Sequence, residues 1–177
     1  QCQLLFGNSD TTRGRRRKPV PQSARLSVLL HSEWRARQLC ELASMVDVTV
    51  SQETPDDNSW LVRMEGPALL PVAQEWTKGA VKTVPAQWRL SDRALQVWAL
   101  VAGVLDESGM CFGLDAHIAQ HEELRKRAAE ALQKLGAASS YVGPRAGGPA
   151  LRVVGQRRLA NVMTIVGEPP EDGSWDA

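Results

Sequence analysis

The residues of this chain that could do hydrolytic chemistry lie at the end of one apolar segment. Residues 99–109 read ALVAGVLDESG, an apolar run that ends in Asp106 and Glu107, followed by Ser108 and Gly109. Carboxylate oxygens are the ligands that Mg²⁺ prefers, and a bound metal can activate water against a phosphodiester. The same letters are also typical of a helix end followed by a turn. These acids therefore allow two interpretations, a metal site or a helix terminus.

A second group of metal-ligand types comprises Cys111, His117 and His121. A structural zinc site takes four such ligands. The pattern predicts His117 in a strand and His121 at a helix cap, and it places no fourth ligand with them. We therefore expect no zinc site, and the chain also lacks a Ser–His–Asp signature, a Walker phosphate-binding loop and a dinucleotide fingerprint.

A basic segment indicates a different chemistry. Residues 13–18 read RGRRRK and hold five cations, namely Arg13, Arg15, Arg16, Arg17 and Lys18. Clustered arginines gain affinity for nucleic acid by releasing its counterions, and such arms bind RNA without folding alone. We interpret the segment as a phosphate-binding arm; the alternative is a solvated charge run or the remnant of a targeting sequence.

The composition limits the possible classes of protein. The chain has 177 residues, of which 43% are hydrophobic and 23% charged, with a formal net charge of +1. This length suits one large domain or two small ones, and the apolar content argues against global disorder. The cysteines Cys2, Cys40 and Cys111 lie far apart, which favours a reducing compartment without a disulfide framework. No apolar run approaches the roughly 20 residues of a membrane-spanning helix.

The hydrophobic pattern predicts the elements that must position these residues. Period-two alternation predicts a strand at 24–30 and a hairpin around TPDDN at 54–58. Helical periodicity predicts helices at 32–46, at 67–79, from Ser91 or Asp92 through 109, and at 121–135. We expect residues 80–91 to form a linker and 168–177 an acidic tail, in which Trp175 docks on a partner rather than in the core.

The chain repeats itself at an offset of 89 residues. The offset aligns the apolar stripe of helix 32–46 with that of helix 121–135, without a gap. It also pairs Val62 with Leu151, Arg63 with Arg152, and Gly66 with Gly155. Helix, hairpin and glycine matching at one offset indicate a duplicated α+β unit. We expect the two units within 1–79 and 92–167, the first carrying the basic arm at 10–23.

Two segments resemble the motifs of the LAGLIDADG homing endonuclease family. Residues 101–109, VAGVLDESG, match the nine-letter motif at Ala102, Gly103, Asp106 and Gly109, and residues 4–9, LLFGNS, resemble the variant first motif. The segment LDAHIAQHEELRKRAAEALQKLG resembles the strand and helix after a motif, and ALRVVGQRRLANVMTIV resembles the closing strand and helix. The resemblance covers most of residues 4–167.

The resemblance implies a geometry. Two αββαββα-type units would be related by a pseudo-twofold axis, with the first motif helix truncated. The two motif helices would pack closely through small residues such as Ala102 and Gly103, and the antiparallel sheets would form a saddle over duplex nucleic acid. Strand alternation then directs Arg63 and Arg152 to the nucleic-acid face. The other residues expected on this face are Arg25, Thr49, Ser51, His117 and Ser140.

The resemblance also decides between the interpretations of 106–109. The family's metal-binding acid stands just before the final motif glycine, a position that Ser108 holds here and Asn8 holds in the first motif. Both side chains are neutral. Asp106 and Glu107 occupy other positions, and one helical residue rotates a side chain by about 100°. We therefore expect no metal, no catalytic residue and no cofactor.

The expected function is that of a catalytically inactive member of this family that binds structured RNA. The partners would be rRNA or intron RNA and neighbouring proteins of an organellar ribonucleoprotein, most simply a mitochondrial ribosome subunit. The chain would be a monomer of two repeats without membrane contact, located in the mitochondrion or alternatively the chloroplast. The alternatives are an organellar intron splicing factor, an active DNA endonuclease that uses Asp106 or Glu107, and a DNA-binding transcription regulator.

Overall fold

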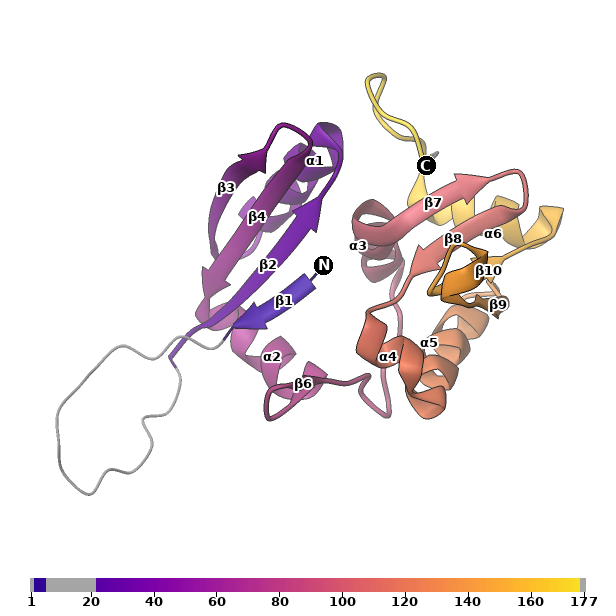
Figure 1. Cartoon of the computed structure of the whole chain (residues 1–177), viewed down its shortest axis with the longest axis horizontal. Coiled ribbons are helices and arrows are strands. Elements are labelled where there is room, and N and C mark those ends of the chain that lie inside the picture. The colour runs from indigo at the N-terminus through magenta and orange to yellow at the C-terminus, as the bar shows by residue number, and fades with distance from the viewer. Residues whose placement is uncertain (1, 6–21, 176–177) are drawn as a thin grey trace, which may run out of the picture. The chain divides into compact units, whose positions relative to one another are not determined.

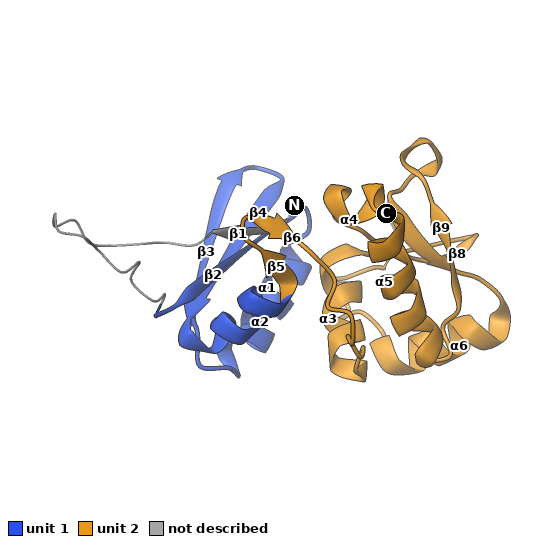
Figure 2. Ribbon diagram, turned by 90° about the horizontal axis from the view of Figure 1, so that it is seen from below, with its two compact units in different colours: residues 1–75 blue, residues 76–177 orange. Residues whose placement is uncertain are grey.

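The computed structural model describes residues 2–5, as backbone alone, and residues 22–175. The chain divides into two compact units, Gln1–Glu75 and Trp76–Ala177, coloured blue and orange in Figure 2. Each unit contains one antiparallel four-stranded sheet, so the architecture is α+β. None of the described helices is both long and apolar enough to cross a membrane.

The first unit is a sheet of order β1-β2-β4-β3 with α1 packed on one face (Figure 1). Its elements are β1 (Cys2–Leu5), β2 (Ala24–Leu30), α1 (Glu33–Ser44), β3 (Thr49–Asp56), β4 (Ser59–Gly66), the 3-10 turn η1 (Pro67–Leu69) and α2 (Leu70–Trp76). The predicted strand at 24–30 is confirmed. Val28 and Val62 face each other across β2 and β4 and are buried under α1, because strand alternation sends every second side chain to that face.

The second unit repeats this order around a sheet β7-β8-β10-β9. Its elements are β5 (Thr77–Lys78), β6 (Val81–Lys82), α3 (Asp92–Ala102), β7 (Gly103–Asp106), β8 (Gly109–Gly113), α4 (Ala116–Gln120), α5 (Glu122–Lys134), β9 (Ser139–Val142), the 3-10 turn η2 (Pro144–Ala146), β10 (Ala150–Val153) and α6 (Gln156–Val166). The core-facing side chains of its central strands, Phe112 and Leu151, are almost fully buried.

The pairing of the closing hairpins reproduces the offset of 89 residue by residue. Ser51 is opposite Arg63 in the first hairpin, and Ser140 is opposite Arg152 in the second. The helices α1 and α5 also begin 89 residues apart, at Glu33 and Glu122. The two sheets are therefore copies of one strand arrangement.

The offset changes before α5, and here the prediction of a strand around His117 is wrong. On β10, Leu151 is opposite Phe112 of β8, and on β4 the equivalent Val62 is opposite Val28 of β2. Phe112 therefore corresponds to Val28, so β2 and β8 match at an offset of 84 residues instead of 89. The five additional residues form α4, whose N-terminus is capped by Asp115 accepting a hydrogen bond from the His117 backbone N–H at 2.9 Å. An N-cap of this kind favours a helix over a strand.

The prediction of one helix from Asp92 to Gly109 is also wrong, because α3 ends at Ala102. Gly103 begins β7, and a Cβ atom there would lie 2.4 Å from the Ala99 carbonyl oxygen and 2.7 Å from Met110 Cε. The glycine therefore permits a sharp exit from α3, and it lies in β7 and not in the helix that the motif predicted. Strands β7 and β8 form a hairpin across Glu107 and Ser108, and this tertiary pairing overrides the helical pattern.

The expected truncated helix at the start of the chain is likewise a strand. Residues Cys2–Leu5 form β1, which pairs with β2 so that Leu5 is opposite Arg25. In the second unit Asp106 is opposite Gly109 at the corresponding place. Asn8 and the basic residues at 13–18 lie outside the described residues.

The predicted linker and tail are packed against the second unit. Trp88 lies between Trp76 and Trp98, with ring centroids 4.9 and 5.9 Å away, so residues 80–91 are anchored by an aromatic row. Trp175 is 7% exposed, and its indole N–H donates to the Gly167 carbonyl oxygen at 3.1 Å. Its predicted role in docking is therefore wrong, because the indole is buried within its own unit.

Candidate nucleic-acid interface

The face of the first sheet opposite α1 carries most of the charge of that sheet. Alternation along β2 and β4 places Arg25, Arg63 and Glu65 on this outer face, since Val28 and Val62 point to the core. The edge strand β3 adds Thr49, Ser51 and Glu53, which stand opposite Glu65, Arg63 and Leu61.

Both arginines of this face are paired with carboxylates of the same face. A terminal nitrogen of Arg25 lies 2.6 Å from Glu65 Oε2, and Arg63 forms an ion pair with Glu53. All four side chains are at least one-third exposed. Exposed pairs add little to stability, typically about 0.2–1 kcal/mol, but they make this face nearly neutral.

The second sheet holds Arg152 at the position equivalent to Arg63. Its Nη2 lies 3.2 Å from Asp106 Oδ2, and its Nε donates to Cys111 Sγ at 3.1 Å. The hydrogen bond to Cys111 and, to a smaller degree, the charge of Asp106 raise the pKa of the Arg152 guanidinium. Arg152 on β10 is thus held by one residue of β7 and one of β8, and its side chain is one-quarter exposed.

Asp106 has both carboxylate oxygens engaged. Oδ1 accepts a hydrogen bond from the Ser108 backbone N–H at 2.7 Å, and Oδ2 faces Arg152. This is the geometry of a carboxylate that stabilises a tight turn. A divalent cation would have to displace both donors, and Ser108 offers only a neutral oxygen beside it.

The other candidate ligands are dispersed. The rings of His117 and His121 meet edge to face with centroids 4.2 Å apart, whereas Cys111 lies on β8 beside Arg152. Across residues 2–5 and 22–175, no three side chains of His, Cys, Asp and Glu converge on one point. Sequence spacing alone had grouped Cys111 with the two histidines; the structure places it on a different element.

The structure thus places Arg25, Arg63 and Arg152 on outer sheet faces, together with Thr49, Ser51 and Ser140. His117 lies on α4 instead. Sequence reasoning missed the acidic partners Glu53 and Glu65. Strand alternation could have placed Glu65 on the face of Arg63, because the two residues are two positions apart on one strand, whereas Glu53 lies on the neighbouring strand, whose register the sequence does not reveal.

The two units differ in charge, which bears on any polyanion that they bind. Residues 22–75 contain four arginines and no lysine against eight Asp and Glu residues, whereas residues 76–175 contain twelve Lys and Arg against ten Asp and Glu. Residues 22–75 therefore carry an excess of negative charge, which disfavours phosphates, and the basic residues at 13–18 add positive charge to the same unit. Comparisons with protein-family models, curated proteins and solved structures found no match for this chain.

Proposed function

We propose that this chain binds structured RNA through phosphate contacts and has no nuclease activity. The supporting observation is the duplicated arginine: Arg63 and Arg152 stand at one register position of two equivalent strands, each on an outer face opposite a serine. An arginine on an outer sheet face does not pack in the core. The presence of an arginine at the same position of both units therefore favours a role in binding a ligand. Phosphate contacts of this kind position a protein on nucleic acid without reading its sequence.

The absence of nuclease activity rests on the chemistry of the motif residues. Asp106 is engaged by Arg152 and by its own turn, and the position before Gly109 is Ser108. Two-metal hydrolysis requires carboxylates that are free to coordinate both ions. The setting that the family resemblance implies, an organellar ribonucleoprotein such as the mitochondrial ribosome, belongs to the same proposal.

The ion pairs limit how much the arginines of the sheet faces contribute to the affinity for RNA. Each arginine must exchange a carboxylate for a phosphate, so the affinity gained is the difference between two similar contacts. The arm at 13–18 should therefore supply most of the electrostatic binding. Each phosphate contact changes the slope of log affinity against log salt by about 0.7–0.9.

The experiment is binding of the full chain to a structured RNA across a salt series. Replacing Arg13, Arg15, Arg16, Arg17 and Lys18 by Ala should flatten the slope by up to about 3.5–4.5. Plasmid nicking with Mg²⁺ or Mn²⁺, measured on the same preparation, should show no cleavage. An unchanged slope in the arm variant would overturn RNA binding through the arm, and cleavage that Asp106→Asn abolishes would overturn the loss of nuclease activity.

Arg63 needs a charge-balanced comparison because Arg63→Ala leaves Glu53 unpaired. We expect Arg63→Ala and the double variant Arg63→Ala/Glu53→Ala to lose the same phosphate contact. Glu53→Ala alone should strengthen binding, since it frees Arg63. If both single variants weaken binding equally, the pair acts as a structural unit and Arg63 does not contact phosphate.

A further inference from the structure

The second unit carries a cluster of cations around two adjoining hollows. A hollow of about 750 Å³ is lined by Gln156, Arg157, Arg158 and Asn161 of α6 and by Leu135 at the end of α5. A second hollow of about 390 Å³ is lined by Arg89, Lys134 and the same Leu135. We call the two together the α5–α6 groove. It contains four cations, all exposed, on a unit of otherwise mixed charge.

These four cations differ from the sheet-face arginines because none is neutralised. Within the described part of the chain, Arg89, Lys134, Arg157 and Arg158 have neither an ion pair nor a side-chain hydrogen bond. A phosphate reaching them displaces water and counterions, and no carboxylate has to be displaced. The free energy available for an anion is therefore larger here than at Arg63 or Arg152.

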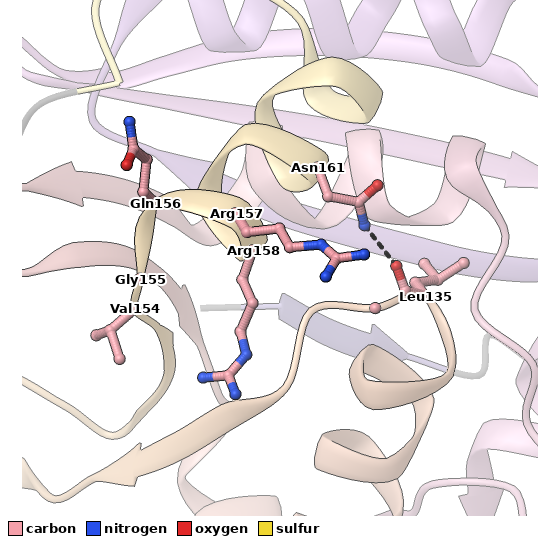
Figure 3. Close-up of a pocket in the computed structure, with 8 residues that line it drawn as sticks. Leu135, Val154, Gly155, Gln156, Arg157, Arg158 and Asn161 are labelled. Atoms are coloured by element: carbon pink, nitrogen blue, oxygen red, sulfur yellow. Dashed lines mark hydrogen bonds between the residues drawn. The ribbon is translucent and has the colours of Figure 1, made fainter.

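The frame of the groove is fixed. Asn161 Nδ2 donates to the Leu135 carbonyl oxygen at 2.6 Å, which joins the middle of α6 to the end of α5 (Figure 3). Gly136 turns the chain with φ +75°, and the Ala137 N–H returns to the Leu132 carbonyl oxygen at 3.0 Å. Figure 3 shows Arg157 extending toward Asn161 and Leu135, while Arg158 leaves the same helical turn in another direction. The two guanidinium groups can thus contact separate phosphates.

At the positions that the offset matches to three of these cations, the first unit has uncharged residues. At the offset of 89, Lys134 corresponds to Met45, Arg157 to Ala68 and Arg158 to Leu69. Leu135 and Asn161 correspond to Val46 and Val72, and the exposed fractions of Met45, Val46 and Val72 are 66%, 55% and 44%. The fold therefore does not require cations at these positions. Their presence in one copy alone indicates a ligand that this copy binds.

We propose that the α5–α6 groove binds the phosphodiester backbone of nucleic acid, at a site separate from the sheet faces. This proposal takes its ligand class from the proposed RNA binding. Four cations distributed over two hollows suit a chain of phosphates better than a single one. The side chains that line the groove include no aromatic ring for base stacking, so the site should hold the backbone with little sequence preference.

The test replaces groove cations by the residues of the first unit. Arg157→Ala/Arg158→Leu removes two charges and introduces the residues that the first unit has at the matching positions, Ala68 and Leu69. The matched control is Lys78→Ala/Arg145→Ala, which removes two other exposed cations of the second unit that also lack a described partner. The probes are a structured RNA, a duplex DNA and vesicles containing anionic phospholipid, each measured across a salt series with the full chain.

The groove variant should flatten the salt slope for nucleic acid by about 1.4–1.8, and the control by much less. Adding Lys134→Met should flatten it by about 0.7–0.9 more. Equal slopes in groove variant and control would overturn the groove, whereas RNA binding through the arm would stand. If the chain binds DNA but no RNA and the groove variant loses that binding, the RNA proposal fails and the groove stands. Binding to vesicles alone would overturn both.

Discussion

The two units share a strand order and a hairpin register, yet their surfaces have diverged in opposite directions. The first unit has a neutral outer sheet face, an acidic folded body and exposed apolar side chains at Met45, Val46 and Val72. The second unit places Lys134, Leu135 and Asn161 at those positions and gathers four unpaired cations around them. Because the fold tolerates both solutions, function is best sought at the positions where the copies differ.

The largest effect should come from the core positions at which the copies differ in size. Phe112 is fully buried and lies 5.3 Å from the Trp98 ring, whereas the first unit has Val28 at the equivalent place. Phe112→Ala should lower the free energy of unfolding by about 3–5 kcal/mol, and Val28→Ala by clearly less. Chemical denaturation followed by tryptophan fluorescence measures both. Equal losses of unfolding free energy would mean that both cores depend to the same degree on the residue at this position of β2 and β8.

The next largest effect distinguishes whether Gly103 lies in a helix, as the motif predicted, or at the start of strand β7. In a continuous motif helix, Gly103→Ala would stabilise the chain by about 1 kcal/mol, because alanine is the better helix former. In the structure, the added Cβ meets the Ala99 carbonyl oxygen, so the substitution should destabilise the chain by about 1–3 kcal/mol. Thermal unfolding of the single variant decides the sign. A stabilised variant would restore the motif helix and weaken the assignment of β7.

A smaller effect concerns α4, which lies between β8 and α5 of the second unit. Burial raises the pKa of Asp115, but hydrogen bonds from Lys82 Nζ and the His117 N–H outweigh it, so the net pKa is lowered. Stability from this carboxylate is therefore full above the ordinary aspartate pKa of about 3.9 and is lost as the pH falls through the lower folded value. Asp115→Asn keeps an N-cap side chain but removes the ion pair with Lys82, so it should cost up to about 1 kcal/mol at pH 7 and less at pH 2. Hydrogen exchange of α4 and α5 amides at both pH values checks this.

The smallest effect on stability is expected from substitutions that give the first unit the residues found at the matching positions of the second. Met45→Lys and Val72→Asn introduce the residues of the equivalent groove positions at side chains that are largely exposed. Each should change the free energy of unfolding by less than about 0.5 kcal/mol. A loss above 1 kcal/mol in denaturant titrations would show that these apolar side chains stabilise the first unit, contrary to their exposure.

Much of the fold could be predicted from the sequence, because local patterns and tertiary packing agree in the first unit. The strand at 24–30 and the offset that relates the two closing hairpins needed no coordinates. The prediction fails between Gly103 and Gln120. There, a helical period continues into residues that pair as a hairpin, and the Asp115 cap creates a helix that the first unit lacks. Neither the close approach at Gly103 nor the pairing with β10 is encoded locally.

The candidate sites, too, could be predicted from the sequence only in part. Alternation placed Arg63 and Arg152 on outer faces, but their pairing with Glu53 and Asp106 depends on strand neighbours that the sequence does not reveal. The groove cations are ordinary helix-surface charges when read alone. Only the offset, which sets Arg157 and Arg158 against Ala68 and Leu69, marks them as a difference between copies.

The tail of the chain has a consequence for how molecules of this protein behave toward one another. The carbonyl oxygen of Trp175 accepts a hydrogen bond from the Leu105 N–H at 2.8 Å, on the side of β7 that no strand of the sheet covers. An open strand edge is a template on which another chain can add, the first step of edge-to-edge aggregation. The buried Trp175 indole holds residues near the end of the chain against the edge of β7, so the Leu105 N–H is already paired. A second chain that added to this edge would first have to displace that hydrogen bond and expose the indole.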